Sequence, residues 1–102
     1  MYTLDITESA ERDLDRITEY IGARLENPPA ALALLDEIES VGNDLRSNPK
    51  LFPLCSDPRL AQFGYRKACV RAYIMVYEVD ADARTVRVLR VFHSSEDYRR
   101  KL

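Results

Sequence analysis

The chain has little of what metal, redox or covalent-catalytic sites require. Its 102 residues include one histidine, His93, and two cysteines, Cys55 and Cys69, which form no CxxC pair. A zinc site needs several such ligands close together, so we expect reduced thiols, no metal and no cofactor. The GxGxxG, GxxxxGKS/T and HExxH motifs are also absent. Their absence removes the usual basis for a dinucleotide enzyme, a nucleoside triphosphatase or a metallohydrolase.

Glycine, proline and long apolar runs are scarce as well. With 3 Gly and 5 Pro, 46 % hydrophobic and 31 % charged residues, the composition is that of a globular protein and not of a disordered or fibrous one. No run of about 18 apolar residues exists, and the first thirty residues carry many charges, so we expect no membrane span, no secretory signal and a cytoplasmic protein. The length predicts a single domain over residues 1–102.

Charge is unevenly distributed along the chain, although the net charge is only −2. Residues 1–64 carry 6 Lys or Arg against 12 Asp or Glu, whereas residues 65–102 carry 9 against 5. A basic block of this kind attracts nucleic acid or an acidic protein segment. The alternative is a solvated strand face followed by a helix end that favours cations.

Hydropathy patterns in the first half predict a strand followed by two helices. Residues 2–7 alternate between apolar and polar, which is the period of a half-buried strand. Thr7 is placed to cap a helix that begins at Glu8 and is interrupted by residues 22–27. Asn27, followed by two prolines, is a typical start for a second helix, which Asn48-Pro49 ends. The apolar stripes of this helical hairpin include Ala10, Leu14, Ile17, Ile21, Ala31, Leu34, Leu35, Ile38, Val41 and Leu45.

The second half predicts a connection, three strands and a final helical turn. Residues 48–64 show no period, and we expect Phe52 and Leu54 to anchor this segment to the core. Residues 65–70, 72–79 and 85–92 are rich in β-branched and aromatic side chains and predict an antiparallel meander whose middle strand is central. Ser94 or Ser95 is placed to cap a short C-terminal helix. The expected fold is therefore α+β: a strand, a two-helix hairpin, a three-stranded meander and a short helix.

Basic and aromatic residues concentrate on the meander and the segment after it. Arg90 shares the strand period of Val86, Val88 and Phe92, so its charge needs a carboxylate, a partner or a phosphate. His93 has a pKa range suited to proton transfer, but a single histidine at a strand end is more often structural. The residues of this group are Tyr65, Arg66, Lys67, Arg71, Tyr73, Arg87, Arg90, His93, Tyr98 and Arg99.

These features together resemble the RelE/ParE superfamily of toxins from bacterial type II toxin–antitoxin modules. The resemblance covers nearly the whole chain, and it depends on the order and spacing of several moderately specific pieces. The pieces are TESAERDL at 7–14 with Ile17, Tyr20 and Ile21, GYRK at 64–67, YIMVYEVD at 73–80 and VRVLRVFHSSEDY at 86–98.

The resemblance implies one of two activities. RelE-like members cleave messenger RNA on the ribosome with several basic residues and often a C-terminal tyrosine or histidine, whereas ParE-like members inhibit DNA gyrase. This chain departs from the RelE pattern, because Ile74 stands where those nucleases have an arginine and Ser94-Ser95 replaces a basic pair. We therefore favour the ParE-like branch. On the RelE-like alternative, the catalytic candidates are Arg66, Lys67, Arg71, Arg90, His93 and Tyr98.

The resemblance also implies partners. We expect a cognate antitoxin to form a hetero-oligomer with the toxin, placing an amphipathic helix beside the helical hairpin and extended chain along the sheet. A third possibility is a non-toxic subunit of the same fold that only binds partners. Expected antitoxin contacts are Leu14, Ile17, Ile21, Leu34 and Ile38, and expected contacts to gyrase, or to the ribosome and messenger RNA, are Tyr65, Arg66, Lys67, Arg90, His93 and Arg99.

Overall fold

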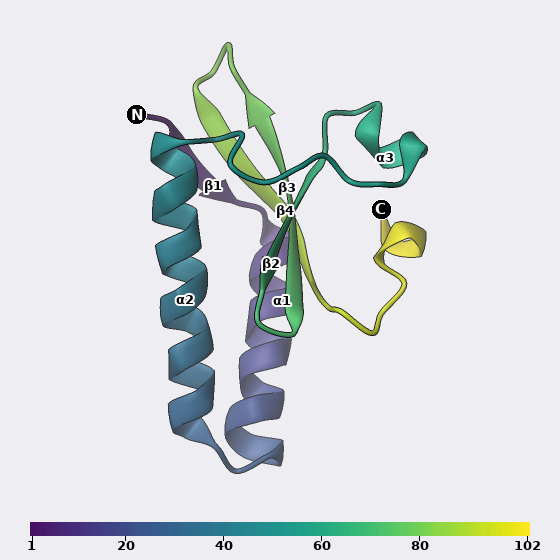
Figure 1. Cartoon of the computed structure of the whole chain (residues 1–102). Helices are drawn as coiled ribbons and strands as arrows, with labels where there is room; N and C mark the ends of the chain where they lie inside the picture. Colours follow the sequence, from purple (N-terminus) through teal and green to yellow (C-terminus); the bar gives the residue numbers. More distant parts are fainter.

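A four-stranded sheet organises the chain, with a helical hairpin on one face and short segments on the other (Figure 1). The computed structural model describes all residues, 1–102. Strand order is β1-β4-β3-β2; β1 runs parallel to β4, and the other pairs are antiparallel. The expected α+β order is confirmed. The elements are β1 (Thr3–Ile6), α1 (Glu8–Glu19), α2 (Pro28–Ser47), α3 (Pro58–Ala61), β2 (Arg66–Val70), β3 (Tyr73–Asp80) and β4 (Thr85–His93).

The helix boundaries follow the predicted caps. The Thr7 hydroxyl accepts a hydrogen bond from the backbone N–H of Ala10 at 3.1 Å, and the Asn27 side chain accepts one from Ala30 at 3.3 Å. The predicted break at Gly22 is wrong in one respect, because a π-helical turn over Tyr20–Arg24 extends α1 past this glycine. The connection that remains between the helices is therefore very short.

Strand β4 contains a bulge that the alternating pattern does not reveal. Val76 pairs with Arg90 and Tyr77 with Val88, so Leu89 is the extra residue. A bulge shifts the alternation by one residue. Val86, Val88 and Val91 consequently lie in one core cluster and Phe92 in the other. The expectation that Arg90 shares a face with Val86 and Val88 is wrong; its guanidinium lies 4.7 Å from the centre of the Phe92 ring.

The two faces of the sheet have separate hydrophobic cores. Under α1 and α2 lies a cluster of 11 buried residues that includes Leu34, Leu45 and Tyr77. The opposite face holds a cluster of 6, covered by the segment around α3 and by the C-terminal tail. These 6 residues are Cys55, Leu60, Ile74, Val76, Phe92 and Tyr98.

The connection at 48–64 is anchored differently from our expectation. Phe52 packs against the helical-face core as expected, but Leu54 is exposed. The backbone of Leu54 pairs with Arg66 as an isolated β-bridge, and the side chains of Cys55 and Leu60 are buried in its place.

The C-terminal turn also starts later than predicted. It is a 3₁₀ helix over Tyr98–Lys101, preceded by Asp97, and neither Ser94 nor Ser95 caps it. The Ser95 backbone N–H instead donates to Nδ1 of His93 at 3.1 Å. None of the helices combines the length and hydrophobicity needed to cross a bilayer.

Candidate functional site

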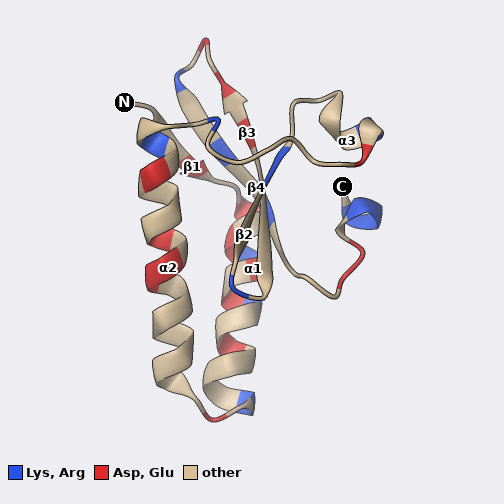
Figure 2. Cartoon of the chain, viewed as in Figure 1, with Lys and Arg blue, Asp and Glu red and all other residues tan.

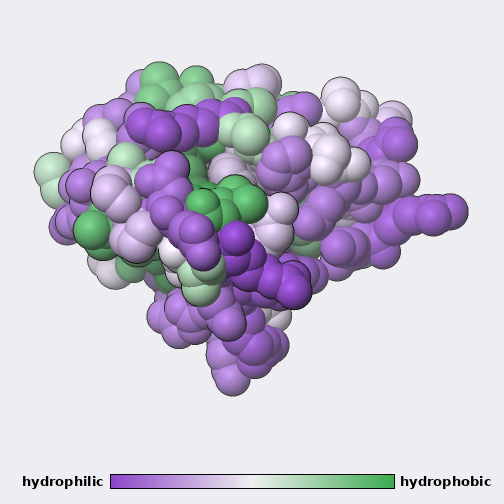
Figure 3. All heavy atoms as spheres, turned by 90° about the horizontal axis from the view of Figure 1, so that it is seen from below, coloured by the Kyte–Doolittle hydropathy of each residue, from purple (hydrophilic) through white to green (hydrophobic).

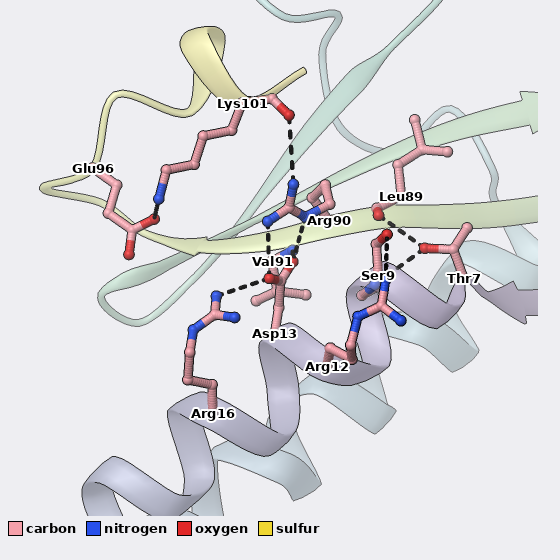
Figure 4. A network of polar contacts seen from close by, with 11 residues as sticks. Thr7, Ser9, Arg12, Asp13, Arg16, Leu89, Arg90, Val91, Glu96 and Lys101 are labelled. Atoms are coloured by element: carbon pink, nitrogen blue, oxygen red, sulfur yellow. Dashed lines mark hydrogen bonds and ion pairs between the residues drawn. The ribbon is translucent and has the colours of Figure 1, made fainter.

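The side chain of Asp13, on α1, lies at the centre of a polar network at the edge of β4 (Figure 4). Its carboxylate accepts hydrogen bonds from Arg90 Nε at 2.7 Å and Nη2 at 3.0 Å, from the Val91 backbone N–H at 2.9 Å and from Arg16 Nη2 at 2.8 Å. The Asp13 side chain is only 1 % exposed. Strand β1 ends opposite Val88, so the Asp13 carboxylate takes the place of a strand partner for the Val91 N–H beyond that point.

The network favours the ionised form of the Asp13 carboxyl group. Burial alone would raise the pKa of the Asp13 carboxyl, but the hydrogen bonds from Arg90, Val91 and Arg16 together hold that pKa below its ordinary value. The same pairing raises the pKa of Arg90. The half-buried Arg90 is therefore paired with a carboxylate of its own chain, that of the buried Asp13.

Other basic residues of the predicted group are also paired internally. Arg71 contacts Glu37 of α2 at 2.8 Å, and Arg99 contacts Asp97 at 3.1 Å. Arg87 contacts two carboxylates, those of Glu78 at 2.8 Å and Asp5 at 3.2 Å. Figure 2 shows the resulting distribution, with acidic residues along α1 and α2 and basic ones at the start of β2 and in the C-terminal turn.

Arg66 and Lys67 are the Arg and Lys members of the predicted group that make no ion pair. Arg66 donates to the backbone carbonyl of Phe52 at 2.8 Å, and Lys67 Nζ lies 5.8 Å from the centre of the Tyr98 ring. Their positive charges are therefore not compensated by a contacting carboxylate. Both side chains are half-buried, and they lie on opposite faces of the sheet, Arg66 toward Phe52 and Lys67 toward Tyr98. We call these two residues the basic start of β2.

Some of the nuclease candidates lie close together near Phe92, under the C-terminal tail (residues 94–102). The ring of Tyr98 stacks on Phe92 with 6.3 Å between centres, and Lys101 and Arg90 lie against the same ring. Arg90 also donates to the Lys101 carbonyl at 3.4 Å. Lys67, Arg90 and Tyr98 thus share the tail-covered face. Arg71 lies apart from them, at the end of β2 against α2.

His93 belongs to a different place, a groove between the end of α1, the end of β4 and the tail. Its ring meets Tyr73 edge-on, with 5.3 Å between centres. Tyr65, another residue of the predicted group, is not part of this groove and instead packs near Phe63, with 5.5 Å between ring centres. The groove has a volume of about 380 Å³, and its lining residues are Arg16, Ile17, Tyr20, Tyr73, His93, Ser95 and Glu96.

The apolar residues expected to meet an antitoxin differ in accessibility. Leu34 and Ile38 of α2 are buried in the chain's own core. Leu14, Ile17 and Ile21 are half-buried against that core. On the outer side of α2, Leu32 is 63 % and Leu35 36 % exposed, so this helix retains an apolar surface that its own fold does not cover.

A comparison with protein families decides the relationship. Residues 4–98 match the family described as ParE toxin of the type II toxin–antitoxin system, parDE. The chain belongs to this ParE toxin family. It is therefore the toxin component of a type II toxin–antitoxin system. No curated protein matches the chain in sequence.

Solved structures share the ParE-family fold of this chain. The chromosomal ParDE system from P. aeruginosa matches with a TM-score of 0.72 at 22 % identity, over 91 % of this chain and 96 % of that one. The RelBE2 toxin–antitoxin complex from Mycobacterium tuberculosis matches with 0.63 at 28 %, over 90 % and 96 %. The isolated E. coli RelE toxin matches with 0.61 at 20 %, over the whole of both chains. The neighbours from complexes support a cognate antitoxin as the partner of this ParE-family toxin.

The sequence analysis missed the helical half of the site in this ParE-family chain. Asp13 and Arg16 were only charges on a helix, and Tyr20 was not singled out as a functional residue. A signal for Asp13 exists in the sequence: it is three residues after Ala10 and four before Ile17, so a carboxylate lies within the apolar stripe. A carboxylate on a buried helix face requires a cationic partner.

Proposed function

We propose that this ParE-family toxin acts by binding DNA gyrase and not by cleaving messenger RNA. The observation that carries the proposal is the capture of Arg90 by the buried Asp13, at 2.7 and 3.0 Å. Metal-independent cleavage of RNA by cations needs uncompensated positive charge around the reacting phosphate. Here Arg71 and Arg90 are neutralised within the chain, and Ile74 is buried at the RelE-type arginine position.

The basic start of β2 is the proposed contact to the target. Arg66 and Lys67 carry uncompensated charge, and Tyr65 beside them is half-buried. His93, at the other end of the sheet, and Arg99, in the C-terminal turn, are proposed as separate contacts to the target. Positive charge that is free of intramolecular partners increases the rate of association with an acidic or DNA-bound target.

The antitoxin is proposed to cover the helical hairpin. Leu14, Ile17 and Ile21 are half-buried and open to further burial, and the exposed Leu32 and Leu35 extend the apolar surface. An amphipathic helix that carries basic residues fits beside this surface, because α1 and α2 carry many acidic residues along their length (Figure 2), most of them exposed. Leu34 and Ile38 would support this surface from within the core.

The second candidate function is RelE-like cleavage of messenger RNA. The specific observation in its favour is that Arg90 and Tyr98 lie against the Phe92 ring and Lys67 lies against the Tyr98 ring. On this alternative the ribosome and messenger RNA replace gyrase as partners. Arg66 lies on the other face of the sheet, where it donates to the carbonyl of Phe52 at the helical-face core, so this group contains two cations, Lys67 and Arg90.

The experiment that separates the two is induced expression without antitoxin, with message integrity and plasmid supercoiling followed together. The proposal expects intact messages and failed supercoiling. It expects the double substitution of Arg66→Glu and Lys67→Glu in the toxin to restore supercoiling. The control Arg24→Glu reverses the charge of an exposed unpaired arginine elsewhere, and supercoiling should fail with it as with the wild-type toxin. Cleaved messages with normal supercoiling would establish the RelE-like alternative. Normal growth with stable antitoxin binding would leave a non-toxic binding subunit.

A further inference from the structure

The groove beside His93 is bordered by Arg16, which belongs to a network with an excess of positive charge. One carboxylate, that of Asp13, is shared by two guanidiniums, those of Arg16 and Arg90. The three groups together carry a net charge of about +1. Arg90 makes two of the contacts to the carboxylate, whereas Arg16 makes one, through Nη2. Arg16 lines the groove and its side chain is 61 % exposed, so the excess charge is accessible there.

The other polar groups of the groove are those of Tyr20, Tyr73, His93, Ser95 and Glu96. The Ser95 backbone N–H donates to His93 Nδ1 at 3.1 Å, and the Ser95 hydroxyl lies 2.7 Å from the same nitrogen. Burial, with Tyr20 and Glu96 nearby, raises the pKa of Tyr73, which keeps this phenol protonated as a donor. Glu96 is the one carboxylate in the lining, and Lys101 neutralises it at 3.2 Å.

The walls of the groove are aromatic, whereas its surroundings are hydrophilic. Tyr20, Tyr73 and His93 provide flat ring surfaces, and Ile17 adds an aliphatic one. Viewed from the end that carries the α1–α2 connection, the surface is mostly hydrophilic, with hydrophobic patches near its centre and along its upper left (Figure 3). Ile17 is shared with the apolar surface proposed for the antitoxin, whereas the rings and Arg16 suit a small ligand that combines a ring with an anion.

We propose that this groove binds a nucleotide, with the phosphate on Arg16 and the base against the tyrosine and histidine rings. The volume of about 380 Å³ suits one nucleotide unit. Arginine forms strong charge-assisted hydrogen bonds with phosphate, and aromatic rings stack on any base. The nucleotide is either free or part of a nucleic acid chain. The site lies away from the basic start of β2 and does not depend on the identity of the toxin's target.

The test is titration of the full-length toxin, released from its antitoxin, with inorganic phosphate, adenosine monophosphate and a short single-stranded oligonucleotide. Calorimetry measures affinity, and NMR follows the ring signals of His93 and Tyr73. We expect the nucleotide to bind more tightly than phosphate and to shift both ring signals. An oligonucleotide that binds more tightly still identifies a nucleic acid chain as the ligand, and equal affinity identifies a free nucleotide.

Matched variants locate the binding. Arg16→Gln should weaken nucleotide affinity by about ten-fold, as expected for one lost charge-assisted hydrogen bond. The fold should persist, because Arg90 and Val91 still donate to Asp13. Tyr73→Phe, which removes only the hydroxyl, should weaken affinity less. Arg24→Gln is the control. Absence of nucleotide binding, equal loss in Arg24→Gln and Arg16→Gln, or inorganic phosphate binding as tightly as the nucleotide would overturn the proposal.

Discussion

The two faces of the sheet are covered by different kinds of structure. On one face, two long helices bury a cluster of 11 residues; on the other, short turns bury a cluster of 6. Helices bury a whole stripe of side chains at once, whereas the tail-covered face depends on single anchors such as Leu60 and Tyr98. The free energy of unfolding should therefore be concentrated on the helical face, and local opening on the tail-covered face.

Asp13 joins the two faces at the open edge of β4. It extends from α1 on the helical face, binds the Val91 N–H at the strand edge, and holds Arg90, whose guanidinium lies over Phe92 on the tail-covered face. The Arg90 contact to the Lys101 carbonyl then continues the network into the tail. Breaking this connection at different points is the direct way to test the comparison.

The largest effect is expected for Asp13→Ala. The change leaves the Arg90 guanidinium and the Val91 N–H without their acceptor, and breaking a buried ion pair costs about 3–5 kcal/mol. Urea unfolding followed by circular dichroism measures this loss. Asp15→Ala, which removes an exposed carboxylate from the same helix, is the matched control and should change stability by less than about 0.5 kcal/mol. Equal effects of the two variants would show that the Asp13 network does not stabilise the fold.

A smaller and more local effect is expected for Tyr98→Ala. Tyr98 is 9 % exposed and stacks on Phe92, so its loss removes the main anchor of the tail. Because the tail can detach without unfolding the helical face, we expect a loss of about 2 kcal/mol, below the usual cost of a core aromatic. Hydrogen exchange should accelerate in residues 94–102 and not in α2. Uniform acceleration through the chain would contradict the separation of the two faces.

The helical face was predictable because its signals are local and repeated. Thr7 and Asn27 cap helices through hydrogen bonds to residues three positions on, and the apolar stripes recur over several turns. The central position of β3 was predictable for a similar reason, because its run of residues is apolar on both faces of the strand.

The tail-covered face was harder to predict because its determinants are single and non-local. The bulge at Leu89 is stabilised by a bond from the Thr7 hydroxyl to the Leu89 carbonyl at 2.9 Å, between residues 82 positions apart. No periodic pattern encodes such a contact, so Arg90 was correctly grouped with Phe92 but wrongly with Val86 and Val88. The exposure of Leu54 likewise depends on its bridge to Arg66. The groove joins Arg16 and Tyr20 to His93 only through the tertiary fold.

The pH dependence of stability should isolate the charged form of Asp13. Its pKa is lowered in the folded state, so its ionisation stabilises the fold above its unfolded pKa of about 3.9 and this contribution is lost as pH falls through the folded pKa. Asp13→Asn keeps an oxygen acceptor but not the charge. The difference in urea midpoint between wild type and Asp13→Asn should therefore shrink from pH 5 to pH 3. A constant difference would mean that packing, not charge, explains the effect of the substitution.

The smallest effect is expected for Arg71→Ala, which removes an ion pair of nearly the same length. Arg71 contacts Glu37 at 2.8 Å and Arg90 contacts Asp13 at 2.7 Å. The first pair, however, is 51 % and 45 % exposed, whereas Asp13 is 1 % exposed. Water and salt screen the exposed charges, and two long side chains lose entropy when they pair. The urea midpoint of Arg71→Ala should match that of wild type. A loss comparable to that of Asp13→Ala would mean that contact distance, and not burial, determines which ion pairs stabilise this fold.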